Sequence, residues 1–77
     1  MNNTRRKALQ KIQERLQEIK DDLQELLGSE EEARDSIPEN MQESERYERA
    51  ENACDDLQSA IDSMEEVDEY INDAIEQ

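Results

Sequence analysis

The stretch LQKIQERLQEIKDDLQEL, residues 9–26, has an apolar residue at every third or fourth position. Alternating steps of three and four place these side chains along one side of an α-helix, a pattern typical of coiled coils. The stretch therefore predicts a long helix whose contact seam consists of Leu9, Ile12, Leu16, Ile19, Leu23 and Leu26.

The second half of the chain repeats these steps and predicts a second long helix. Asp68 is the one charged residue on its seam. Cys54 is expected to be a small buried residue of the seam, and Tyr70 lies off the seam and is expected to be exposed. The second seam consists of Tyr47, Ala50, Cys54, Leu57, Ile61, Met64, Asp68, Ile71 and Ile75.

The segment GSEEEARDSIPEN, residues 28–40, separates the two seams. It contains two pairs with the spacing of a helix-capping box, Ser29 with Glu32 and Ser36 with Glu39. Pro38 fits only the first turn of a helix, where its missing N–H costs nothing. We predict a helix over about 4–34, a turn over about 35–38 and a helix over about 38–76.

Gly28 leaves two alternatives for the first helix. It either ends a helix, with a short helical segment following, or is tolerated as a kink at a cost of about 1 kcal/mol relative to alanine. A kinked continuation is preferred because Ala33 and Ile37 keep the spacing of the seam.

The two seams pair if the chain folds back on itself. Facing residues of an antiparallel hairpin have a constant sum of residue numbers, and a turn between Ser36 and Ile37 makes that sum 73. Asp68 would then face Arg5. The predicted fold is all-α, a single antiparallel two-helix coiled-coil hairpin over residues 1–77, with dimerisation into a four-helix bundle as a further possibility.

Charge supports this direction of pairing. Residues 55–77 contain nine acidic residues and no Lys or Arg. Bases at a helix N-terminus and acids at a C-terminus both oppose the helix macrodipole, so each end gains from lying against the other. The basic start of the first helix consists of Arg5, Arg6, Lys7, Lys11 and Arg15.

A second apolar row accompanies the seam of the second helix at intervals of seven residues. One interpretation is that small side chains let a third helix approach closely, so that two hairpins self-associate. The other is that these residues are simply good helix formers beside the seam. The row consists of Ala53, Ala60, Val67 and Ala74.

Composition limits the classes of function. The chain has 77 residues, 42% of them charged, and a formal net charge of −14. This charge argues against direct nucleic-acid binding, which uses Lys and Arg to displace counterions, and favours a basic protein surface as partner. No apolar run suggests a signal peptide or membrane span, and the lone Cys54 fits a reducing compartment, so we expect a cytoplasmic protein.

The sequence offers no catalytic or metal-binding motif. It contains no His, which removes His-based triads, zinc motifs and the di-iron signature of helix bundles. Adjacent acidic pairs point about 100° apart on a helix and do not converge on one ion or proton. We therefore expect a non-enzymatic protein without cofactors.

The acidic residues of the second helix form a stripe. Their steps of three, four or seven residues keep them on one face, with Arg46 and Arg49 only at its beginning. The stripe is either a solvated helix face or a docking surface for a basic groove. The acidic stripe consists of Glu51, Asp55, Asp62, Glu66, Glu69, Asp73 and Glu76, and Glu48 extends it by one residue at its start.

Three features of the sequence together resemble those of a known class of proteins. They are the basic start, the connecting segment SIPENMQESER at residues 36–46, and the final helix rich in Ala, Leu and Glu. The chain resembles small acidic helical-hairpin proteins of phages and prophages of Gram-positive bacteria. The resemblance implies a mobile-element origin and an accessory role. In charge and size the chain is also similar to nucleic-acid-mimicking inhibitors of the anti-CRISPR and anti-restriction type. The alternative is a structural scaffold, adaptor or assembly protein that acts through apolar helix faces.

Overall fold

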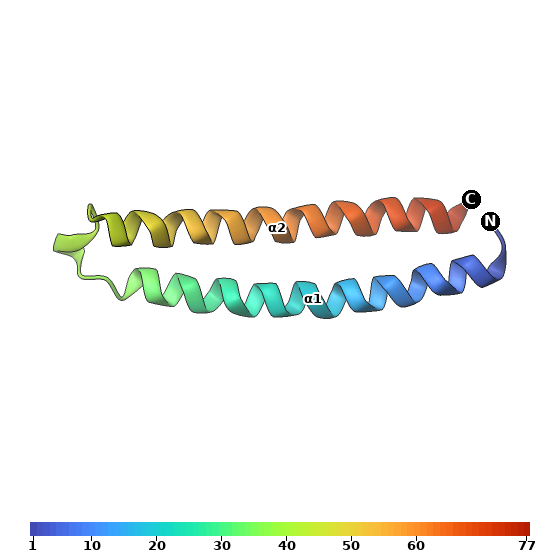
Figure 1. The fold of residues 1–77 in the computed structure, drawn as a ribbon, viewed down its shortest axis with the longest axis horizontal. Helices are drawn as coiled ribbons and strands as arrows, with labels where there is room; N and C mark the ends of the chain where they lie inside the picture. The colour runs from blue at the N-terminus through green and yellow to red at the C-terminus, as the bar shows by residue number, and fades with distance from the viewer.

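A computed structural model describes all residues, 1–77, as two long helices and a short connection. Helix α1 spans Asn3–Asp35, a 3-10 helix η1 spans Glu39–Met41, and helix α2 spans Glu45–Glu76. The helices lie antiparallel, so both termini are at one end of a rod and the connection is at the other (Figure 1). The rod measures 59 × 16 × 12 Å. The predicted all-helical hairpin is confirmed.

Helix α1 is continuous. Its first turn is capped by Asn2, whose side-chain oxygen accepts from the Arg5 backbone N–H at 2.8 Å. The helix runs through Gly28 without a break, and Gly28 has no positive φ that would require a glycine. Gly28 therefore does not end the helix, and the two-segment alternative for this region is wrong.

Replacing Gly28 with alanine is expected to stabilise the protein. A Cβ atom at this position meets no other atom within 4 Å, so the added methyl group introduces no clash. Alanine also restricts the unfolded chain, and the free energy of unfolding should rise by about 0.5–1 kcal/mol. Thermal unfolding followed by circular dichroism measures the change. The matched control is Ala33→Gly in the same helix, which should lower stability by a similar amount; equal melting temperatures for all three proteins would contradict the prediction.

The connection is longer than expected. Helix α2 begins at Glu45, seven residues after the predicted start near Pro38, and Ser44 caps it by accepting from the Tyr47 backbone N–H at 3.3 Å. Pro38 precedes the short helix η1 instead. Ser36 does not cap a following helix, because its hydroxyl donates to the Glu32 carbonyl at 2.7 Å at the end of α1. The capping-box spacing therefore misplaced the second helix.

This longer connection changes which residues face each other. Arg6 Nε donates to the Ile75 carbonyl at 2.9 Å, Gln13 Nε2 donates to Asn72 Oδ1 at 2.7 Å, and Lys20 Nζ lies 3.8 Å from Glu65 Oε1. These pairs have residue numbers that add to 81 or 85, not 73. The predicted register, including Arg5 opposite Asp68, is wrong. The physical reason is that residues 36–44 all belong to the connection, so the hairpin turns near residue 40.

The core is a thin line between the helices. Only Ile37, Cys54 and Ile61 are buried, with 5%, 4% and 2% of their surface exposed. The predicted seam of α2 agrees with the structure, because all nine of its residues are buried or half-buried. The thin core means that much of the apolar surface of a long amphipathic helix stays outside it.

The inner face of α1 differs from the prediction. Leu9, Leu16 and Leu23 are half-buried as expected, but Ile12, Ile19 and Leu26 are 40%, 49% and 59% exposed. The positions between the leucines of the observed face are Gln13, Lys20 and Leu27, which are half-buried. Helix α1 is therefore rotated so that one of its two apolar rows lies to the side of the contact with α2, partly exposed.

Candidate interaction surfaces

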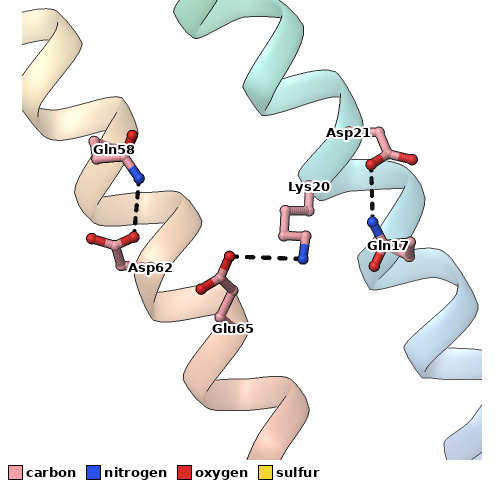
Figure 2. A network of polar contacts seen from close by, with 6 residues as sticks. All are labelled: Gln17, Lys20, Asp21, Gln58, Asp62 and Glu65. Atoms are coloured by element: carbon pink, nitrogen blue, oxygen red, sulfur yellow. Dashed lines mark hydrogen bonds and ion pairs between the residues drawn. The ribbon is translucent and has the colours of Figure 1, made fainter.

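One face of the hairpin is polar. Figure 2 shows Lys20 of α1 and Glu65 of α2 pointing toward each other, beside the Gln17–Asp21 and Gln58–Asp62 hydrogen bonds. Gln13 and Asn72 join the helices on the same face, one to two turns nearer the termini. These contacts fix the rotation of both helices and so determine what lies on the other face.

The opposite face is apolar. Ile19 follows Leu16 by three residues and Lys20 follows it by four, so at 3.6 residues per turn they project to opposite sides of Leu16. By the same geometry Ala60, one residue before Ile61, lies on the opposite side of α2 from Glu65. Since Lys20 and Glu65 share one face, Ile19 and Ala60 share the other.

Two rows make up this apolar face. The large row on α1 consists of Ile12, Ile19 and Leu26, and the small row on α2 consists of Ala53, Ala60, Val67 and Ala74. All three residues of the large row are exposed, as are Ala60 and Val67, and Ala53 and Ala74 are half-buried. The small row was recognised in the sequence. The large row was missed as a surface because its spacing also fits a contact seam.

The acidic stripe is the second candidate surface. All seven of its residues are exposed, and none of them is in an ion pair. The ion pairs of the protein use Glu65, Asp35 and Glu45 instead. Asp62 accepts a hydrogen bond from Gln58, which leaves its charge in place. The stripe therefore faces water as a continuous, uncompensated negative surface.

The basic start of α1 does little to neutralise these carboxylates. Arg6 donates to a backbone carbonyl at the C-terminal end of α2, where the helix dipole favours a cation. Arg5, Lys7, Lys11 and Arg15 are exposed and form no ion pair. Lys20–Glu65 is the only ion pair between the helices. The basic end of α1 lies beside the acidic end of α2 as expected, but ion pairing between the two helices is confined to Lys20–Glu65.

Cys54 and Tyr70 are placed as the sequence predicted. Cys54 is buried and is a free thiol, and burial raises the pKa of that thiol, which keeps it in the neutral form. Tyr70 is 73% exposed and lies on the outer side of α2. Cys54 is therefore a packing residue, and Tyr70 adds an aromatic ring to the acidic surface.

A hollow between the helices, on the side of the Lys20–Glu65 pair, is lined by seven residues, of which Leu16 and Met64 are apolar. It holds the half-buried Asp68 together with Leu16, Lys20 and Met64. No group of three or more acidic, Cys or His side chains is arranged to hold a metal ion. Neither helix has a stretch both long and apolar enough to cross a membrane.

No family model, curated protein or solved structure matches the chain.

Proposed function

We propose that this protein is a non-enzymatic helical interaction protein whose acidic stripe docks on a basic protein surface. The observation that carries the proposal is that seven exposed carboxylates on one helix have no cationic partner within the protein. A row of uncompensated charge raises the local concentration of oppositely charged partners and speeds their association. It is also a poor surface for nucleic acid, which carries the same sign of charge.

The partner class we infer is a protein with a groove that binds nucleic acid. From Glu51 to Glu76 the stripe extends roughly 38 Å at 1.5 Å per residue, which is long enough to fill such a groove. Its carboxylates hydrogen-bond and attract Lys and Arg as phosphates do. The resemblance to small acidic hairpin proteins of phages and prophages fits an inhibitor of the anti-CRISPR or anti-restriction type, acting in the cytoplasm of a bacterial host.

The test is affinity capture from a bacterial extract on the immobilised protein, with elution by either salt or short duplex DNA and identification by mass spectrometry. Nucleic-acid-binding proteins should be captured, and both eluants should release them, with affinity falling roughly tenfold or more as salt is raised. A variant with Asp62, Glu66, Glu69 and Asp73 changed to Lys should lose this capture.

The matched control is a variant with four reversals on α1, at Glu14, Glu18, Asp22 and Glu25. These residues are exposed and lie outside the stripe, so the control has the same net charge as the stripe variant and should keep more of the capture. Circular dichroism must show equal helix content in both variants. Capture that duplex DNA and salt leave unchanged, or equal loss in both variants, would rule out docking through the stripe.

A second candidate function is a structural one, as a scaffold, adaptor or assembly protein that acts through apolar helix faces and self-associates into a four-helix bundle. The observation in its favour is the large row, which leaves Ile12, Ile19 and Leu26 in water. In this case the acidic stripe serves solubility, and the two reversal variants above assemble alike.

A further inference from the structure

We infer that the apolar face of the hairpin is covered by a second copy of this chain, with α1 of each copy packed on α2 of the other. The inference rests on the self-association proposed above and gives it an interface. In this arrangement the large row of each copy packs on the small row of its partner. The two-fold axis runs along the bundle, so both connections lie at the same end.

The large exposed area of a single hairpin is the first argument that a second copy of the chain covers the apolar face. The chain exposes 5980 Å², whereas a folded monomer of 9.1 kDa exposes about 4,900 Å². The excess of roughly 1,100 Å² is similar to the area that each partner buries in a standard stable interface, about 800 Å². Three buried residues are also too small a core for a chain of this length to depend on alone.

The sizes of the two rows explain why the large row fits the small one. Contacts whose residue numbers add to 81–85 fix the level of each residue along the rod. Ile19 is then level with residues 62–66, between Ala60 and Val67 of the small row. The other two residues of the large row, Ile12 and Leu26, likewise lie between neighbouring residues of the small row. A two-fold axis along the rod preserves these levels in the partner. Each large side chain therefore faces a gap between two small ones, as knobs-into-holes packing requires.

Charge selects this arrangement over the one in which like helices face each other. Residues 1–20 contain six Lys or Arg and two Glu, and residues 55–77 contain nine acids and no base. With α1 on the partner's α2, each basic segment lies between the acidic segments of both copies. With α1 on α1 and α2 on α2, the two-fold axis must cross the rod, so each basic segment lies at the opposite end of the bundle from its partner's acidic end. The two α2 helices then lie against each other, and like charges at an interface oppose association. The surface thus fits a second copy in one orientation.

The first experiment measures mass. Sedimentation velocity or light scattering should give twice 9.1 kDa for the full chain, and Ile19→Glu should give the single-chain mass because it places a charge in the centre of the face. Tyr70→Glu is the control, since Tyr70 lies outside both rows, and it should keep the dimer mass. A single-chain mass for the unaltered protein at micromolar concentration overturns the inference.

The second experiment measures orientation and does not depend on whether Ile19→Glu folds. In a Cys54→Ala background, a chain with Ile19→Cys is mixed with a chain with Ala60→Cys and oxidised. A disulfide between the two different chains is expected. A disulfide between two Ile19→Cys chains instead would mean that α1 faces α1, which overturns the orientation. Neither experiment uses a basic partner, so the result is separate from that of the capture experiment on the acidic stripe.

Discussion

Replacing Ile61 with alanine is expected to lower the free energy of unfolding by about 2–4 kcal/mol, the range for deleting a fully buried aliphatic side chain. Ile61 is 2% exposed and is the most deeply buried residue of the protein. The loss combines the transfer free energy of the removed atoms with the cost of the cavity that they leave between the two helices. In a chain of this size it should lower the melting temperature by roughly 10–25 °C.

Thermal and urea unfolding followed by circular dichroism measures the effect, at one protein concentration for all variants. The control is Tyr70→Ala, which removes a larger side chain that is 73% exposed and should change stability by less than about 0.5 kcal/mol. If the two substitutions cost the same, the line of contact between the helices is not where the structure places it.

The fold class could be predicted from the sequence because the hydrophobic period of both helices is regular. The seam of α2 was also correct, since its apolar residues offer one continuous line from Tyr47 to Ile75. Helix α1 offers two lines that share Leu9, Leu16 and Leu23. The line through Ile12 and Ile19 has more apolar residues, so the sequence favours it as the contact with α2. In the structure, however, α1 contacts α2 along the line through Gln13 and Lys20. These half-buried polar residues are tolerated at the contact between the helices because each has a partner on α2.

The choice between the two lines depends on the partner helix, which is why α1 alone could not reveal it. Gln13 needs Asn72 opposite, and Lys20 needs Glu65. Both pairs form only in the register set by a connection that ends at Ser44. Ser44 is not followed three positions later by the acidic residue that marks a capping box, whereas Ser29 and Ser36 are. The sequence therefore predicted a helix start, and so a turn, earlier in the chain than the observed one. One misplaced cap therefore changed the register and, through the register, the apparent core of α1.

The acidic stripe could be predicted as a surface from the sequence, but the large row could not, because the contact line of α1 depends on the register between the helices. Exposure of the acidic stripe follows from the α2 seam alone, which the periodicity determines. The large row could become visible as a surface only after the register was known, because its residues satisfy the criteria for a core. The hairpin itself leaves this row uncovered, and the proposed pairing of two hairpins would bury it.

Replacing Asp68 with leucine is expected to raise the free energy of unfolding by about 1 kcal/mol. Asp68 is the one charged residue of the α2 seam, is half-buried beside Leu16 and Met64, and has neither a hydrogen bond nor an ion pair. Lys20 lines the same hollow, but its ion pair is with Glu65. Leucine would add apolar contact on both helices, where each buried CH₂ group contributes about 0.8 kcal/mol, and would remove a charge from an acidic helix.

Thermal unfolding measures this gain, which should appear as a rise of roughly 4–8 °C in melting temperature. The control is Asp56→Leu, which removes the same charge from an exposed position of the same helix and should give a smaller change because little of the new side chain is buried. A rise of equal size in both variants would assign the gain to reduced repulsion along α2. A loss of stability in Asp68→Leu alone would mean that attraction between Lys20 and Asp68 across the hollow outweighs apolar packing, and that the seam keeps an acid at this position because it helps to set the register.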